Sequence, residues 1–152
     1  MLPIESVDHV GIRVSDKEAS VAFYRRLGFA LIADAGFAAG HPVILRHRAS
    51  GVTLNLLGPS TAGDGGNILM DIEAKHPGIT HVALRVSSLK ETRALLEAES
   101  IPITGSFHFG RLEAVFIRDP DRNVIELDEL SAAEGTDEGA SENASEDYAA
   151  HP

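Results

Sequence analysis

The chain has 152 residues, of which 43% are hydrophobic and 5% aromatic, and it contains no cysteine. This length predicts one domain with an aliphatic core, and the lack of cysteine excludes disulfides, thiolate metal ligands and cysteine nucleophiles. The net charge of −10 gives no electrostatic support for nucleic-acid binding. No apolar run approaches the ~20 residues of a membrane span, and residues 1–10 lack a secretory pattern. We therefore expect a cytoplasmic protein with no membrane or nucleic-acid partner.

Hydrophobic periodicity and helix-capping signals predict two successive β-α-β-β-β segments. Asp16 is suited to cap the first helix and Gly28 to end it. Gly and Pro residues between the segments predict a linker, within which a short strand at 67–72 is possible. In chain order, we expect a strand at 7–14, a helix at 16–27, strands at 29–33, 42–48 and 52–57, a strand at 79–86, a helix at 88–100, and strands at 101–104, 113–118 and 123–128.

These elements predict an α+β fold in which two βαβββ modules form a cupped mixed β-sheet with helices on its outer face. The predicted domain covers residues 1–130, with modules at 5–58 and 78–130 and a linker at 59–77. Residues 131–152 hold six acidic residues and no Lys or Arg. Since this tail also nearly lacks large apolar side chains, we expect it to be disordered.

A seven-residue phrase occurs twice in the chain. Residues 9–15 read HVGIRVS and residues 81–87 read HVALRVS. Both phrases alternate apolar and other positions, as a half-buried strand does. Two strands related by such a repeat can bring His9 and His81 together across a pseudo-twofold axis, which is a starting point for a metal site.

Alternation also predicts which side chains share a face. His9 lies with Gly11 and Arg13, and the repeat places the second histidine in the same way. In the last strand, VIELDEL, Glu126 lies on the face opposite the apolar residues that must pack on a helix. His9, His81 and Glu126 then converge as a set of two imidazoles and one carboxylate. Such a set suits a divalent ion with open coordination positions, such as iron, manganese, nickel, cobalt or zinc.

The counterpart of Glu126 in the first module is expected in the strand at 52–57. The 72-residue offset of the histidines gives Leu54, whereas a one-residue indel gives Asn55. Alternation favours Asn55, because Leu54 belongs to the apolar face. The amide oxygen of Asn55 is a candidate fourth ligand, and a polar wall residue that holds a water is the other reading.

The chain resembles the vicinal oxygen chelate superfamily, which groups glyoxalase I, methylmalonyl-CoA epimerase, bleomycin-binding proteins, fosfomycin-resistance proteins and extradiol dioxygenases. The resemblance covers residues 5–129 and is carried by DHVGIRVSD (8–16), AFYRRLGF (22–29), GITHVALRVS (78–87) and FIRDPDRNVIELDE (116–129). It implies paired βαβββ modules around a metal, with His9, His81 and Glu126 at the ligand positions. It also implies a homodimer, often with each site built from both subunits.

Departures from the family patterns bear on the reaction. Asn55 stands where glyoxalases carry Glu and epimerases carry Gln. Extradiol dioxygenases carry an acid-base His near Val52 and a Tyr at Phe116, although His108 resembles a His found before their last turn. His108 is therefore a candidate acid-base group or substrate contact, with a solvated loop residue as the other interpretation.

The expected function is that of a divalent-metal-dependent enzyme of the glyoxalase-like type, an isomerase or lyase. Its substrate is expected to be a small molecule that chelates the metal through vicinal oxygens, with Glu126 as the proton-transferring base. One alternative is an Fe(II)-dependent extradiol-type ring-cleaving dioxygenase. A second alternative is a metal-free small-molecule-binding or resistance protein.

Overall fold

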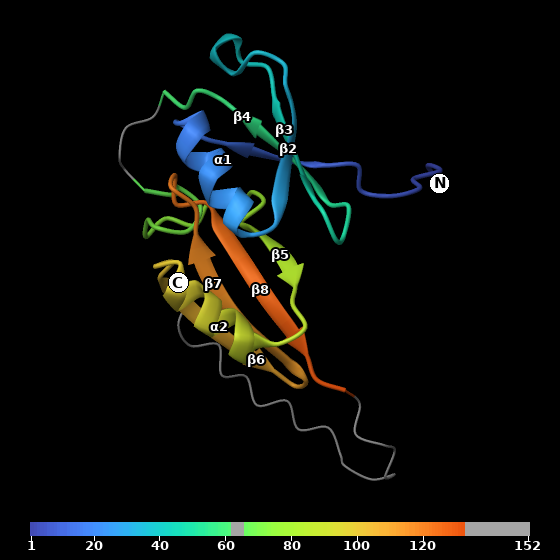
Figure 1. Cartoon of the computed structure of the whole chain (residues 1–152), viewed down its shortest axis with the longest axis vertical. Coiled ribbons are helices and arrows are strands. Elements are labelled where there is room, and N and C mark those ends of the chain that lie inside the picture. The colour runs from blue at the N-terminus through green and yellow to red at the C-terminus, as the bar shows by residue number, and fades with distance from the viewer. Residues whose placement is uncertain (62–65, 133–152) are drawn as a thin grey trace. The chain divides into compact units, whose positions relative to one another are not determined.

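The computed structural model describes residues 1–61 and 66–132. The chain divides into two compact units (Figure 1). Unit 1 contains residues 1–68 and the turn at 119–123, and unit 2 contains the rest of the chain. The predicted disorder of the tail concerns residues 133–152 for the most part, and these lie outside the described residues. Within the described residues, no helix is both long and apolar enough to cross a membrane.

Unit 1 is built around a four-stranded mixed sheet with one helix. The strands lie in the order β1-β4-β3-β2, with β1 parallel to β4 and the other neighbours antiparallel. A short 3-10 helix, Phe37–Ala39, follows β2. The elements are β1 (Val10–Arg13), α1 (Lys17–Arg26), β2 (Phe29–Asp34), β3 (Val43–His47) and β4 (Thr53–Leu57).

Unit 2 repeats this topology. Its strands lie in the order β5-β8-β7-β6, with β5 parallel to β8 and the other neighbours antiparallel. The predicted α+β class with two βαβββ modules is thereby confirmed, as two four-stranded sheets that each carry one helix. The elements are β5 (His81–Arg85), α2 (Leu89–Ala98), β6 (Ile103–Phe109), β7 (Leu112–Arg118) and β8 (Val124–Leu130).

Both helices begin at the same kind of cap. The side chain of Asp16 accepts a hydrogen bond from the Ala19 N–H at 2.9 Å, and Ser88 accepts one from the Glu91 N–H at 3.2 Å. Each bond satisfies a donor that the first helical turn leaves unpaired. Gly28 follows α1 with a φ of 90°, a conformation that glycine adopts without steric cost, so the predicted start and end of this helix are confirmed.

The predicted alternation of faces is also confirmed. Ile12 and Val14 are 8% and 0% exposed, whereas Gly11 and Arg13, which alternate with them, are exposed. Leu54 is 2% exposed and belongs to the buried face of β4. The aliphatic residues therefore form the core of each unit, and the opposite face of each sheet carries the polar residues.

The DPDRN turn at 119–123 is held by side-chain hydrogen bonds within unit 1. The Tyr24 hydroxyl donates to the Asp119 carboxylate at 3.0 Å, and the Asp121 carboxylate accepts the Ser15 N–H at 3.0 Å. The Asn123 amide donates to the Arg13 carbonyl at 3.1 Å. The turn therefore groups with unit 1, although it joins β7 to β8 along the chain.

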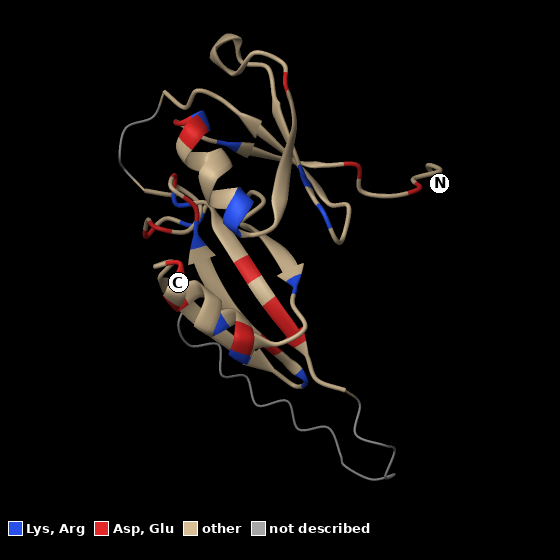
Figure 2. Cartoon of the chain, viewed as in Figure 1, with Lys and Arg blue, Asp and Glu red and all other residues tan. Residues whose placement is uncertain are grey.

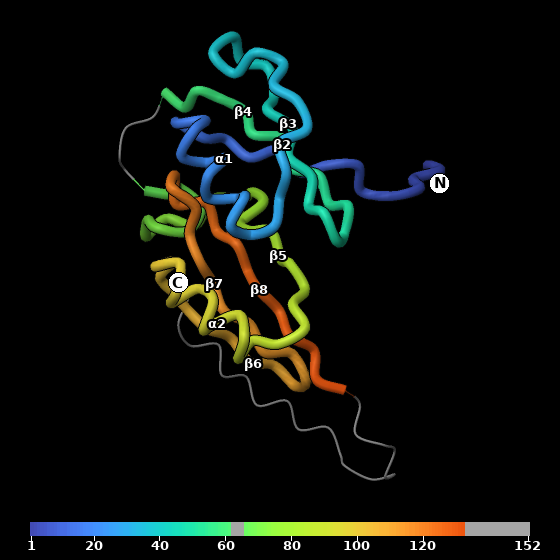
Figure 3. The backbone as a smooth tube through the Cα atoms, viewed as in Figure 1, coloured from blue at the N-terminus to red at the C-terminus, as the bar shows by residue number. Residues whose placement is uncertain are grey.

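Two local predictions are wrong. Residues 67–72 form turns and bends rather than a strand, because polar side chains there bond outside any ladder: Asp71 pairs with Arg118 at 2.9 Å, and Asn67 donates to the Arg122 carbonyl. Residues 105–112, which lie between the strands predicted at 101–104 and 113–118, instead belong mostly to the β6–β7 hairpin (Figure 3). Its strands close at a tight turn around Gly110, where φ is 56°, a geometry that glycine favours in hairpins.

Candidate metal centre

His81 and Glu126 meet on the polar face of unit 2. The His81 Nε2 atom lies 2.9 Å from the Glu126 Oε2 atom. Glu126 is only 8% exposed. It lies in β8, a strand along which Figure 2 shows acidic positions. The parallel pairing of β5 and β8 places Ala83 opposite Glu126, and the small side chain of Ala83 leaves room for the imidazole and carboxylate to meet.

Neighbouring side chains fix the orientation of the His81 ring. The Thr80 hydroxyl lies 2.8 Å from Nδ1. Phe116, directly opposite Glu126 on β7, meets the ring edge-on with centroids 6.3 Å apart. With Nδ1 held by Thr80, Nε2 is the nitrogen that faces the carboxylate.

His9 has an equivalent arrangement in unit 1. Its Nδ1 atom lies 2.6 Å from the Asp8 Oδ1 atom. A carboxylate on Nδ1 fixes the tautomer that leaves Nε2 available as a ligand and raises its basicity. The sequence analysis assigned no role to Asp8 or Thr80. Their shared position, directly before a repeated histidine, could have suggested that each contacts the imidazole beside it.

The electrostatic surroundings of Glu126 disfavour the charged form of its carboxyl relative to an exposed glutamate. Burial raises the pKa of the Glu126 carboxyl, and the Asp128 carboxylate on the same face raises it further, whereas His81 lowers it. Two carboxylates this close repel each other as anions. A cation at this point would relieve that repulsion.

The register of unit 1 identifies the counterpart of Glu126. Asn55 lies opposite Gly11 in the β1–β4 pair, as Glu126 lies opposite Ala83. This matches the predicted one-residue indel. The Asn55 Oδ1 atom is buried and has no hydrogen-bond partner among the residues that the structure describes. An unpaired buried amide oxygen is costly unless something else satisfies it.

The chemistry of these donor atoms suits a divalent metal ion. Two ligand atoms bound side by side to one ion at about 2.1 Å are ~3 Å apart, close to the 2.9 Å between His81 Nε2 and Glu126 Oε2. The orphaned oxygen of Asn55 is a further donor of suitable chemistry. Imidazole with carboxylate and amide oxygen is a set that manganese, iron, cobalt, nickel and zinc accept.

The structure brings two of the predicted site residues into contact within one unit. His81 and Glu126 are in contact, whereas His9 and Asn55 belong to unit 1. Across residues 1–61 and 66–132, no group of three His, Asp or Glu side chains lies close enough together to hold an ion.

The predicted catalytic placement of His108 is not supported by the register. His108 pairs with Glu113, and Gly105 pairs with Phe116, the residue opposite Glu126. His108 is three residues from Gly105 along β6, so it lies on the helix-covered face, opposite to Glu126. The structure therefore does not bring His108 to the His81–Glu126 pair.

The sequence pattern of the Glyoxalase/Bleomycin resistance protein/Dioxygenase superfamily matches residues 6–127, a span that contains His9, Asn55, His81 and Glu126. The chain belongs to this superfamily. The match extends from before β1 into β8, so both βαβββ modules are family modules.

One relative of known name is an enzyme. A lactoylglutathione lyase of Schizosaccharomyces pombe (strain 972 / ATCC 24843) is 28% identical over 131 residues, which is 79% of this chain and 43% of the yeast protein. The chain thus spans less than half the length of that relative.

Solved structures show the fold. An antibiotic binding protein, TnmS3 from Streptomyces sp. CB03234, superposes with a TM-score of 0.65 at 23% identity, covering 86% of this chain and 100% of its own. A lactoylglutathione lyase from Agrobacterium tumefaciens gives a TM-score of 0.60 at 22% identity, covering 84% and 95%. One fold therefore accommodates a lyase and a ligand-binding protein, and the site must decide between them.

Proposed function

We propose that this protein is a divalent-metal-dependent lyase or isomerase of the glyoxalase type. Its substrate would be a small molecule that presents two adjacent oxygens to the metal. The observation that carries the proposal is the buried Glu126 carboxylate held 2.9 Å from the His81 Nε2 atom. The 28% sequence identity to a lactoylglutathione lyase supports the proposed reaction class.

In this proposal, His9, His81 and Glu126 would hold the ion, and Asn55 would contribute its amide oxygen. The ion would supply Lewis-acid stabilisation of negative charge that develops on the substrate oxygens. Thr80 and Asp8 hold the two imidazoles through Nδ1, so that each Nε2 is presented to the site.

Glu126 is the proposed proton carrier. Its carboxylate takes a proton from the carbon next to a substrate carbonyl and returns it to the neighbouring carbon. The burial of Glu126 and the adjacent Phe116 ring limit access of water to this carboxylate. A single carboxylate is enough for such a one-base transfer.

We further propose that the protein acts as a homodimer, with sites built from the modules of both subunits. The face of unit 2 that carries Glu126 also exposes apolar side chains, since Phe107 and Phe109 are 42% and 73% exposed and Leu130 is 44% exposed. Phe109 and Leu130 lie in one cross-strand row through Leu112. A second copy of the chain would bury this apolar surface.

Activity assays separate the proposal from its alternatives. Loss of hemithioacetal absorbance, or entry of solvent deuterium into a substrate, is the expected result with metal-loaded protein, and Glu126→Gln should abolish it. Oxygen uptake with catechols would contradict the proposal in favour of a dioxygenase. Tight binding of a small molecule with no turnover and no metal would contradict it in favour of a binding protein.

A further inference from the structure

A positively charged region interrupts this acidic chain. Residues 19–61 contain Arg25, Arg26, Arg46 and Arg48 but one acidic residue, Asp34. Asp34 is bonded to Lys17 at 2.9 Å. A net positive segment in a chain of net charge −10 is suited to hold an anion.

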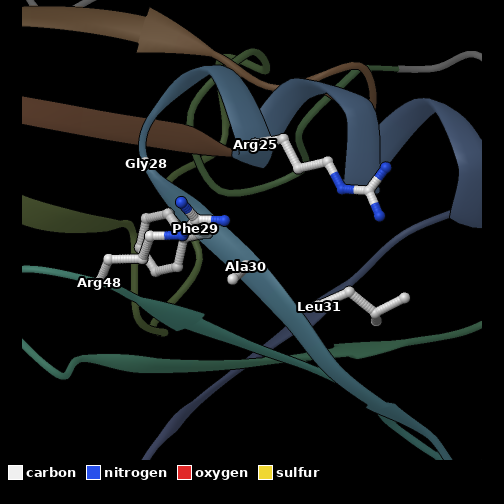
Figure 4. A pocket seen from close by; sticks show the side chains of 6 residues that line it. All are labelled: Arg25, Gly28, Phe29, Ala30, Leu31 and Arg48. Carbon is white, nitrogen blue, oxygen red and sulfur yellow. The ribbon is translucent and has the colours of Figure 1, made fainter.

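Two of these arginines flank a pocket in unit 1 with a volume of about 450 Å³ (Figure 4). Such a volume falls within the range of small-molecule sites, roughly 300–1,000 Å³. The pocket lies where the end of α1 meets β2 and the end of β3. It is lined by Arg25, Gly28, Phe29, Ala30, Leu31 and Arg48.

The two arginines of the pocket are available to a ligand. Within the described residues, neither the Arg25 nor the Arg48 guanidinium has an acidic partner. Both residues are exposed. In Figure 4 the two guanidinium groups lie apart, with that of Arg25 beside α1 and that of Arg48 near the start of β2. Two separated cations favour a ligand with two anionic groups, because each guanidinium binds a phosphate or carboxylate through paired N–H donors.

The backbone of β2 adds uncharged hydrogen-bonding groups between them. β2 is an edge strand of its sheet. Since the Arg48 N–H donates to the Gly28 carbonyl, the alternation of an antiparallel ladder directs the N–H and C=O groups of Phe29 and Leu31 away from β3. Hydroxyl groups, which both donate and accept, match such an edge.

We propose that this pocket binds a small polyol that carries two anionic groups, such as a sugar bisphosphate. Arg25 and Arg48 each bind one anionic group, and the outer edge of β2 bonds the hydroxyl groups between them. The pocket lies within unit 1 and uses none of the proposed metal ligands, so the proposal stands independently of the proposed function.

The test is calorimetric titration of the full chain with fructose 1,6-bisphosphate at constant ionic strength, with fructose as the uncharged control ligand. We expect saturable binding of the bisphosphate and none of fructose. Arg25→Ala and Arg48→Ala should each weaken the affinity about tenfold or more, as loss of a charged hydrogen bond does.

Two matched variants make the result specific. Arg26→Ala removes the same charge from the same helical turn, but Arg26 lies over the Phe23 ring, 5.4 Å from its centroid, and does not line the pocket. His81→Ala removes a proposed metal ligand. We expect both to bind the bisphosphate as the parent does. No saturable binding, equal losses in Arg25→Ala and Arg26→Ala, or loss of binding in His81→Ala would each overturn the proposal.

Discussion

The two modules share a backbone plan but differ in the charge placed at its centre. Gly11 pairs with Asn55 in unit 1, and Ala83 pairs with Glu126 at the same step of unit 2. One position therefore carries a neutral amide in one module and a carboxylate in the other. Under the proposed function, the second module would therefore supply the acid-base group at this position, whereas the first would supply a neutral amide.

The residues before the two histidines also differ in charge, but here the charged residue belongs to unit 1 and the neutral residue to unit 2. Asp8 holds Nδ1 of His9 with a charged oxygen, and Thr80 holds Nδ1 of His81 with a neutral one. Each imidazole thus has one carboxylate near it. The carboxylate lies at Nδ1 of His9 and at Nε2 of His81. Single substitutions can test each of these differences between the modules.

The largest effect on metal binding is expected at Glu126, the carboxylate that stands where unit 1 has Asn55. Glu126→Gln should weaken divalent-metal affinity by more than about 100-fold, beyond the 10–100-fold that loss of an outer-shell contact costs. It should also abolish turnover. Competition with a metallochromic chelator measures the affinity. A Glu126→Gln protein with parental metal affinity would remove Glu126 from the site.

The next effects are expected at the residues that hold the imidazoles. Asp8→Ala should weaken metal affinity about 10–100-fold, since it removes the outer-shell carboxylate of His9. Thr80→Ala should cost less, because a neutral hydroxyl polarises the ring less strongly. The same chelator competition compares the two variants, and a larger loss in Thr80→Ala would contradict the assignment.

The helix of unit 1 makes a buried hydrogen bond for which the helix of unit 2 has no matching side chain. Leu96 occupies in α2 the position, 72 residues on, that Tyr24 occupies in α1, and the hydroxyl of Tyr24 bonds to the buried Asp119. Tyr24→Phe should lower the free energy of unfolding by about 1–2 kcal/mol, the cost of a buried hydrogen bond whose acceptor keeps its other donors. Chemical denaturation measures it.

A double-mutant cycle supplies the control for this prediction. Asp119→Asn alone and combined with Tyr24→Phe should show coupling, because the two side chains share one bond. Additive effects would mean that the bond seen between Tyr24 and Asp119 contributes nothing to stability.

The smallest expected effect comes from making the modules more alike. Asn55→Asp should raise metal affinity about tenfold, a modest share of what a second negative charge can contribute at ~4 Å. Asn55→Leu should leave the affinity unchanged or lower it slightly. Isothermal titration with Mn²⁺ compares both variants with the parent, and equal affinity of Asn55→Asp and Asn55→Leu would place Asn55 outside the site.

Much of the fold was predictable because its signals are local. Alternation predicted the faces of β1, β5 and β8, Asp16 predicted the start of the first helix, and the repeat indicated the two modules. The correspondence of Asn55 with Glu126 followed from alternation before the register was known. These features depend on neighbours within a few residues.

The remaining features depend on contacts that sequence periodicity does not encode. The face of His108 depends on the length and register of β6, which was predicted too short. The roles of Asp8 and Thr80 depend on ring orientation. The pocket beside Arg25 and Arg48 exists only because the end of α1 meets the turn after β3, and no local pattern reports that meeting.

The central claim is that His81 and Glu126 are ligands of a divalent ion. Elemental analysis of protein purified without chelator and without nickel-affinity chromatography tests it, with His81→Ala prepared in parallel. The account predicts a stoichiometric divalent metal in the parent and its loss from His81→Ala. Parent protein that takes up no metal even after reloading, or a His81→Ala variant with unchanged metal content, would contradict it.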